Sequence, residues 1–209
     1  GGTTLEATKA VAEFYRSFVT GEVLMTDART AEMAKLTENS FRDVNIAFAN
    51  ELSILCDKFK IDVWELIRLA NRHPRVNILQ PGTGVGGHCI AIDPWFIVHE
   101  GGEDARIIRA AREINDYKMQ WLTKRILEEI ESNERAPTVA CMGLAFKPNI
   151  DDLRESPAVS VFQSLVQSGN EPIAVEPNLK SHKSIVLTDY NEAVKQADIV
   201  VYLVAHNEF

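Results

Sequence analysis

The stretch TVACMGLAF, residues 138–146, decides the predicted fold. It is a short, nearly continuous apolar run, which is typical of a strand buried on both faces of a parallel sheet. Two more strand-like segments follow at 172–176 and 198–204, and helical patterns lie at 157–168 and 191–196. Alternating strands and helices predict βαβ crossovers. We therefore expect residues 134–209 to form a Rossmann-like parallel α/β domain, with the domain boundary inside the polar, Pro-containing stretch 132–137.

Upstream of this stretch the pattern is almost entirely helical. Helices are predicted at 4–18, 27–60, 62–71 and 104–132, and EVLMT at 22–26 is a short strand candidate. The helix at 27–60 contains no Pro or Gly and greatly exceeds the usual length of about 11–12 residues. Such a helix either crosses a whole domain or forms an interface. The fold class is therefore α/β overall, with an all-α domain at 28–133 built on this helix.

Composition limits the class of function. The 209 residues carry 22 Lys and Arg against 30 Asp and Glu, for a net charge of -8, which argues against a nucleic-acid binder but not against a small anionic ligand. There is no apolar run of about 20 residues and no signal-peptide pattern. Cys56, Cys89 and Cys141 have neither disulfide-framework nor zinc spacing. We expect a cytoplasmic protein without a metal site.

A Gly-rich loop, PGTGVGGHCIAIDP at residues 81–94, is the densest candidate site. It formally contains G-x-G-x-x-G, but no strand precedes it, so it is not interpreted as a dinucleotide fingerprint. If Cys89 stands at a helix start, the helix dipole favours its nucleophilic thiolate, and Asp93 would lie one turn on, placed to orient a water or a proton. The alternative is a structural Cys buried in a tight turn.

Two further groups of polar residues are candidates. Lys35, Asn39 and Arg42 share one face of the long helix, which suits a polyanionic or hydroxyl-rich ligand; a solvated helix face is the alternative. The segment FKPNIDDLRESP at 146–157 follows the first strand of the sheet, where such sheets bind ligands, and offers Lys147 and Arg154 to phosphates. A surface loop with self-compensating charges is the alternative there.

Taken together, these motifs resemble the UDP-glucose/GDP-mannose dehydrogenase family. KLTEN at 35–39, GVGGHC at 84–89 with Asp93, and GLAFK at 143–147 with DDLRESP at 151–157 occur in that family's order and spacing. The resemblance covers nearly the whole chain. It implies an NAD-dependent oxidation of a sugar CH2OH to a carboxylate through two hydride transfers.

The resemblance also implies roles for the catalytic candidates. Cys89 would attack the intermediate aldehyde to give a thiohemiacetal, which is oxidised to a thioester and hydrolysed. Lys35 would be the general acid/base or stabilise the oxyanion, Asn39 would hold the oxyanion or the water, and Asp93 would assist proton transfer.

Binding residues follow from the same resemblance. The residues implied to contact the nucleotide sugar are Arg42, His73, Arg75, Gly86, Phe146 and Lys147. Arg154 would reach NAD. The family implies a homodimer through the helix at 28–60, in which His73 and Arg75 serve the neighbouring subunit's site.

The resemblance leaves the exact sugar open. Ala91-Ile92 stands where the UDP-glucose enzymes have Pro-Lys. This departure favours a UDP-N-acetylhexosamine over UDP-glucose and leaves N-acetylmannosamine and N-acetylglucosamine both open. The product would be a uronic acid for surface polysaccharide.

The family's dinucleotide-binding domain has no counterpart in the chain. Residues 1–27 resemble the tail of that domain, and 134–209 resembles an incomplete nucleotide-sugar domain, so we expect the 209 residues alone to be inactive. Two alternatives are a non-catalytic nucleotide-sugar-binding dimerisation module and a cysteine hydrolase or acyltransferase using Cys89 with His88. The second is disfavoured because adjacent residues rarely face each other productively.

Overall fold

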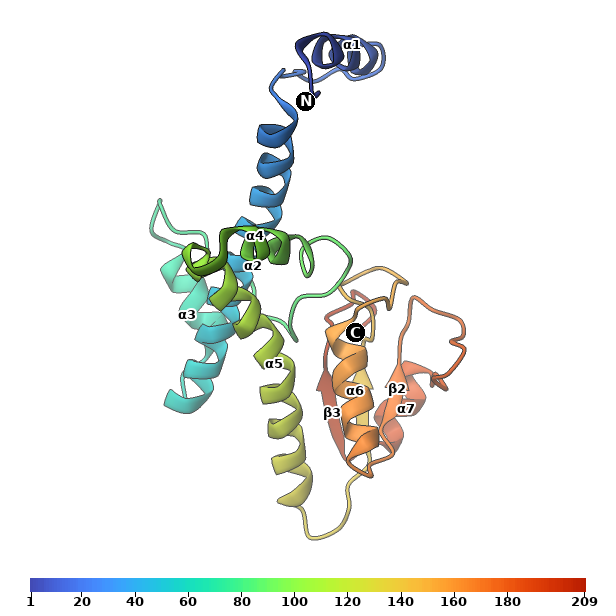
Figure 1. Ribbon diagram of the computed structural model, residues 1–209. Helices are drawn as coiled ribbons and strands as arrows, with labels where there is room; N and C mark the ends of the chain where they lie inside the picture. The colour runs from blue at the N-terminus through green and yellow to red at the C-terminus, as the bar shows by residue number, and fades with distance from the viewer.

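The computed structural model describes all of residues 1–209 and has a helical part followed by an α/β part (Figure 1). The helices are α1 (Leu5–Arg16), α2 (Ala28–Phe59), α3 (Val63–Ala70), α4 (Asp93–Gly101), the short 3-10 helix η1 (Gly102–Asp104), α5 (Arg106–Glu131), α6 (Pro157–Gln167) and α7 (Tyr190–Gln196). The strands are β1 (Val139–Met142), β2 (Ile173–Val175) and β3 (Ile199–Tyr202). This confirms the predicted fold class. None of the helices combines the length and the apolar character that crossing a membrane requires.

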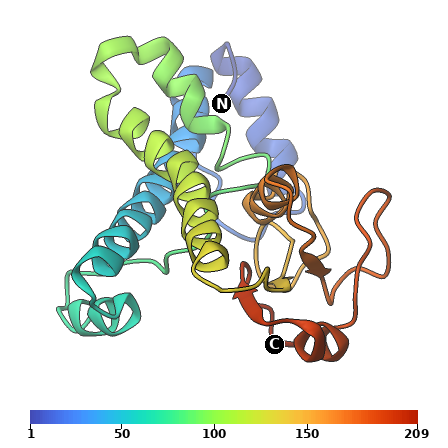
Figure 2. The same ribbon diagram turned by 90° about the horizontal axis from the view of Figure 1, so that it is seen from below.

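α2 is the axis of the helical part. Its N-cap is Asp27, whose side chain accepts a hydrogen bond from the Thr30 amide, and it ends at Lys60, whose backbone is left-handed at φ 57°. Over 32 residues it passes α1 at one end and α3 and α5 at the other (Figure 1). Seen from below, α5 lies between α2 and α6 (Figure 2), so α5 connects the helical part to the sheet.

The strand expected at 22–26 is wrong. This segment joins α1 to α2 without strand structure, and the nearby pairing is a single isolated bridge between Gly2 and Asp27. A strand needs a neighbour to accept and donate its backbone hydrogen bonds, and no β-strand runs alongside this segment.

The sheet has the order β2-β1-β3, with both pairs parallel. Side chains of β1 alternate between two faces. Val139 and Cys141 pack into a core that α5 and α6 complete, whereas Ala140 and Met142 pack with Ala193 of α7 on the other face. β1 is apolar throughout because both of its faces are covered. Because all three strands are parallel, their carboxyl ends meet at one edge of the sheet.

Candidate active site

Cys89 lies in a turn that precedes α4. Its side chain is exposed, and its carbonyl oxygen accepts hydrogen bonds from the amides of Ile92 (3.2 Å) and Asp93 (2.8 Å). Cys89 does not stand at a helix start, which was the condition for a dipole effect on its thiolate, because α4 begins at Asp93. Pro94, in the first turn of α4, fits a helix start and explains the difference. The turn still brings Cys89 and Asp93 together.

Asn39 and Asp93 meet across the α2–α4 contact. The Asn39 amide nitrogen donates to the Asp93 carboxylate at 2.5 Å, and Asn39 is 5% exposed. A buried amide held in this way has a fixed orientation. The structure therefore joins three of the predicted catalytic residues through one turn and one side-chain contact.

The other polar residues on this face of α2 are more open. Lys35 is exposed and its ammonium lies 3.4 Å from the Glu38 carboxylate, an exposed pair that contributes little stability. Arg42 is exposed. Both side chains are free to turn toward a ligand, and neither is held against Cys89.

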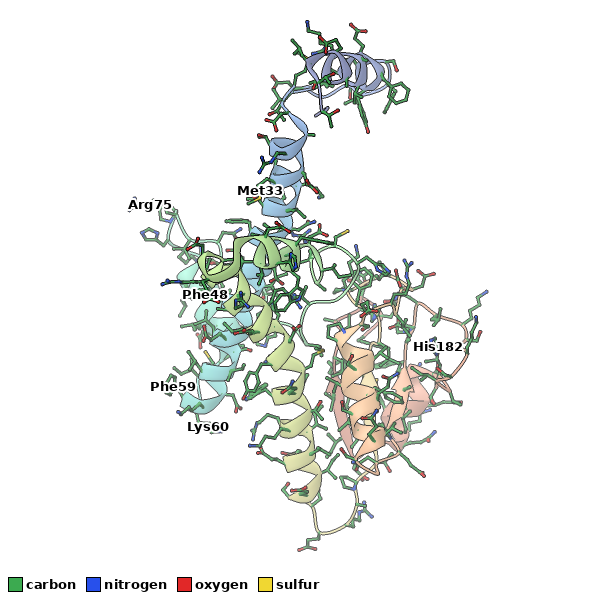
Figure 3. The ribbon with its side chains drawn as sticks, in the orientation of Figure 1. Met33, Phe48, Phe59, Lys60, Arg75 and His182 are labelled. Atoms are coloured by element: carbon green, nitrogen blue, oxygen red, sulfur yellow. The ribbon has the colours of Figure 1, made fainter.

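A groove of about 890 Å³ runs between the first half of α2 and α4. Its lining residues are Arg29, Thr30, Glu32, Met33, Leu36, Phe96, Ile97, Glu100 and Gly101. On α2 its lining residues precede Asn39 in the chain, and one of them, Met33, is labelled in Figure 3. The sequence alone did not predict this groove, because it depends on how two helices cross.

The Gly-rich loop packs directly against the segment that follows β1. A Cβ added to Gly86 would collide with the Glu155 carbonyl oxygen and lie 2.6 Å from Pro157. At Gly87, whose φ is +80°, it would lie 3.0 Å from the Phe146 ring. Only glycine allows this close approach. Two motifs that are about sixty residues apart in the chain therefore form one surface.

Lys147 and Arg154 lie on that segment beyond Phe146. The Lys147 ammonium lies 5.7 Å from the centre of the Phe146 ring, and the Lys147 side chain is exposed. The Arg154 guanidinium donates hydrogen bonds of 2.6–3.1 Å to the Asp152 carboxylate. These hydrogen bonds lower the pKa of the Asp152 carboxyl to about 2, with a small contribution from His88. Lys147 is thus available to an anion, whereas Arg154 would first have to leave Asp152.

The structure does not bring His73 and Arg75 to this surface. Both are exposed on the loop after α3, and the His73 ring accepts from the Arg75 amide at 3.3 Å. Figure 3 shows Arg75 on the far side of α2 and α5 from the sheet. Within one chain these residues are remote from Cys89 and Lys147.

A buried polar network holds the start of the Gly-rich loop, and the sequence did not predict it. The Gly82 amide donates to Asn50 at 2.8 Å, and the Asn50 amide donates to Asn115 at 2.8 Å. Asn115 in turn donates to the Asp43 carboxylate at 2.8 Å. Asn50, Asn115 and Asp43 are all fully buried. The loop is thereby tied to both α2 and α5.

The Gly-rich loop does not fit a dinucleotide. It lies between α3 and α4 with no strand before it, so it lacks the strand–turn–helix setting of a dinucleotide fingerprint. Its glycines serve packing against α5, α6 and Phe146 instead. No group of three or more His, Cys, Asp or Glu side chains is placed to hold a metal ion.

Two family models match the chain. The central domain of the UDP-glucose/GDP-mannose dehydrogenase family matches residues 29–117, and the UDP binding domain of the same family matches residues 140–209. The chain belongs to the UDP-glucose/GDP-mannose dehydrogenase family. This confirms the resemblance inferred from the motifs.

Relatives of this dehydrogenase family match over the whole chain. It is 55% identical to the UDP-N-acetyl-D-mannosamine dehydrogenase of Campylobacter jejuni, covering 100% of this chain and 53% of the relative. It is 54% identical to an NDP-N-acetyl-D-galactosaminuronic acid dehydrogenase of Ralstonia nicotianae, covering 100% and 50%. A solved structure of the UDP-N-acetyl-mannosamine dehydrogenase Cap5O from S. aureus superposes with a TM-score of 0.87 at 44% identity, over 99% of this chain and 49% of that one. The chain thus spans about half the length of the relatives it matches.

Proposed function

We propose that this chain supplies the thiol and nucleotide-sugar part of an NAD-dependent UDP-N-acetylhexosamine 6-dehydrogenase. The observation that carries the proposal is the packing of Gly86 and Gly87 on Phe146, Glu155 and Pro157. This packing sets the loop that bears Cys89 beside the segment that bears Lys147. A nucleotide sugar whose diphosphate meets Lys147 has its sugar directed toward the turn of Cys89 and Asp93.

In the proposed reaction the side chains of this chain act on the sugar carbon that is oxidised. The Cys89 thiolate adds to the C6 aldehyde, which gives a thiohemiacetal and later a thioester that water cleaves. Lys35 is the general acid/base or balances the developing oxyanion, Asn39 orients the oxyanion or water, and Asp93 moves the proton. NAD+ is the oxidant, but the Gly-rich loop does not fit it, so no hydride-transfer step is assigned to these residues.

The preferred substrate is proposed to be UDP-N-acetyl-D-mannosamine, with the corresponding mannosaminuronic acid as a building block of surface polysaccharide. Support comes from the 55% identical relative and from Ala91-Ile92 after Cys89. A relative named for a galactosaminuronic acid is 54% identical, so the shared feature is the N-acetylhexosamine rather than one stereocentre. UDP-N-acetylglucosamine and then UDP-glucose are the next candidates.

Alkylation of Cys89 tests the proposal on the 209-residue chain itself. Cys89 is exposed and the other two cysteines are buried, so iodoacetamide should label Cys89 first. UDP-N-acetylmannosamine should slow this labelling at least tenfold, UDP-glucose should slow it less, and Lys147→Ala should abolish the protection. Lys180→Ala, which removes an exposed lysine elsewhere in the same domain, is the control. Unchanged labelling at saturating nucleotide sugar would refute the placement of the site.

The catalytic role needs a chain that also carries an NAD-binding domain. There, Cys89→Ser should abolish net NADH production while nucleotide-sugar binding persists. Unchanged NADH production in that variant would refute covalent catalysis.

A second candidate, for the 209 residues by themselves, is a nucleotide-sugar-binding dimerisation module without chemistry. The poor fit of the Gly-rich loop to a dinucleotide favours it. NAD+ reduction by the purified 209-residue chain would exclude it.

A further inference from the structure

Glu176 is a buried carboxylate at the carboxyl end of β2 that the proposed reaction does not use. It is 3% exposed. One carboxylate oxygen accepts hydrogen bonds from the amides of Leu144 (2.7 Å) and Ala145 (2.9 Å), just after β1, and lies 3.1 Å from the His206 ring. The other oxygen accepts from the Asn178 amide at 3.1 Å. Groups from the ends of all three strands thus satisfy a buried negative charge.

His206 has one tautomer that fits these contacts. Its Nδ1 accepts from the backbone amide of Asn149 at 3.0 Å, so the proton of the neutral ring lies on Nε2. Nε2 then donates to Glu176. His206 thereby also holds Asn149 on the segment that presents Phe146 and Lys147.

The amides that donate to this carboxylate lie just after β1, where dinucleotide-binding sheets present amides to a phosphate. In such sheets the turn after the first strand and the N-terminus of the next helix offer free backbone amides to the pyrophosphate. Here Glu176 occupies the amides after β1. The space beside Gly143, whose φ is +82°, is filled by the protein itself, because a Cβ there would lie 2.7 Å from Val204 Cβ. The lack of a side chain at Gly143 therefore leaves no room for a ligand.

The start of α6 is closed as well. Pro157, in its first turn, has no N–H to offer, and the Ser156 side chain accepts from the Val159 amide at 3.5 Å. Gly86 of the Gly-rich loop covers this end, with Pro157 2.6 Å from the position of its absent Cβ. The two places where a Rossmann-like sheet binds anions, the amides after β1 and the start of α6, are therefore both occupied by the protein itself.

We propose that Glu176 is a specificity-determining residue whose carboxylate takes the place of a ligand phosphate at the amides of Leu144 and Ala145 and so closes this sheet to the diphosphate of a dinucleotide. A nucleotide sugar must then be held by side chains such as Lys147 rather than by these amides. The rejection of dinucleotide diphosphates rests on the buried contacts of Glu176 and not on the proposed reaction, so it can be tested without turnover.

Amide NMR spectra of the deuterated, 15N-labelled chain give the first test. In the unaltered protein the Leu144 and Ala145 amides should be protected from hydrogen exchange. Millimolar inorganic pyrophosphate or NAD+ should not shift their signals. Added UDP-N-acetylmannosamine should shift signals in 146–154 but not these two. A shift of Leu144 and Ala145 by any of the three would overturn the proposal.

Variants of Glu176 give the second test. Glu176→Ala frees the two amides and should bind pyrophosphate at least tenfold more tightly than the unaltered chain, with shifts at Leu144 and Ala145. Glu176→Gln, which still fills the position, and Glu171→Ala, which removes an exposed carboxylate before β2, should gain nothing. A folded Glu176→Ala protein without this gain would overturn the proposal, and the first test still decides if that variant does not fold. Absence of any nucleotide-sugar shift would count against the proposed function alone.

Discussion

At the scale of single residues, Lys118 shows how burial governs an ionisable group. Its side chain on α5 is 5% exposed, donates to the Ser53 hydroxyl at 2.8 Å and lies 3.9 Å from the centre of the Trp121 ring. Desolvation lowers the pKa of Lys118 to about 8, against the opposing pull of Asp57. Keeping the Lys118 amine charged therefore costs free energy in the folded chain but not in the unfolded chain.

This cost predicts a stability that depends on pH. Below about pH 8 the Lys118 amine is charged in both the folded and the unfolded chain, and the desolvation cost is fully present. Between pH 8 and about 10.4 the unfolded chain binds more protons than the folded chain, so the free energy of unfolding rises with pH. Relative to Lys118→Met, the unaltered chain should gain about 2 kcal/mol in free energy of unfolding between pH 7 and pH 10. Urea unfolding at both pH values measures this. Lys124→Met, at an exposed position on α5, should show a constant difference, and an equally constant difference for Lys118→Met would contradict the prediction.

At the scale of elements, α2 and α5 are joined by a buried ion pair rather than by apolar contacts alone. Arg112 of α5, 2% exposed, donates to the fully buried Asp43 of α2 at 2.7 Å and to Asp116 at 2.6 Å. Burial raises the pKa of Asp43, although Arg112 opposes this effect. Removing one partner leaves a buried charge without compensation.

Substitutions of this pair should therefore be strongly non-additive. Arg112→Met should lower the free energy of unfolding by about 3–5 kcal/mol. The double change Asp43→Leu with Arg112→Met should lower the free energy of unfolding by clearly less than the sum of the two single changes, because neither partner of the pair is then left buried and unpaired. Urea unfolding of the four proteins in the cycle measures the coupling. Arg125→Met, which removes a half-exposed arginine of the same helix, should cost far less, and an additive cycle would contradict the assignment.

The elements also show what the sequence could and could not predict. Asp27, with no Gly or Pro after it, predicted α2 almost to the residue, and the apolar run at 138–146 predicted the central strand. The strand at 22–26 failed because a strand depends on a partner that sequence does not reveal. Cys89 does not stand at a helix start, because Pro94 fits the first turn of α4, which begins at Asp93. Glu176 and the Asn50–Asn115 contact could not be predicted, since their partners lie 30 to 65 residues away.

The same limit applies to the site. The motifs nominated candidate residues whose roles stay predictions, and the contact of Asn39 with Asp93 brings two of these candidates together. They did not predict that the Gly-rich loop would pack on Phe146, because that contact is created by the placement of α5 between the two parts of the chain. The separation of His73 and Arg75 from Lys147 likewise appears only in three dimensions.

At the scale of the whole molecule, one side of α2 carries exposed apolar side chains. Phe41, Phe48, Leu55 and Phe59 are 69%, 51%, 40% and 61% exposed. Their spacings of seven, seven and four residues place them on one stripe of the helix. Figure 3 shows Phe48, Phe59 and Arg75 on the side of α2 away from the sheet. A contiguous apolar stripe of this kind is typical of a protein interface.

The expected occupant of this stripe is a second copy of the chain, because a dimer would also explain the remote His73 and Arg75. Paired through α2, each chain could extend these residues toward the site of its partner. Sedimentation velocity at micromolar concentration should then give about twice the 23.4 kDa chain mass, and Phe48→Glu should give single chains. Val186→Glu, on an 89% exposed side chain after β2, should leave the dimer intact.

Shared sites make a stronger prediction than mass alone. If Arg75 reaches the partner's nucleotide sugar, then Arg75→Ala should weaken UDP-N-acetylmannosamine binding by about tenfold for one lost charge-assisted contact. Phe48→Glu should weaken binding at least as much, because separated chains also lose His73. The two changes combined should weaken binding no further than Phe48→Glu alone, because Arg75 has no role once the chains have separated. Titration calorimetry on the four proteins measures this. A dimer whose affinity ignores Arg75, or monomers that bind as tightly as the unaltered chain, would show that each site is complete within one chain.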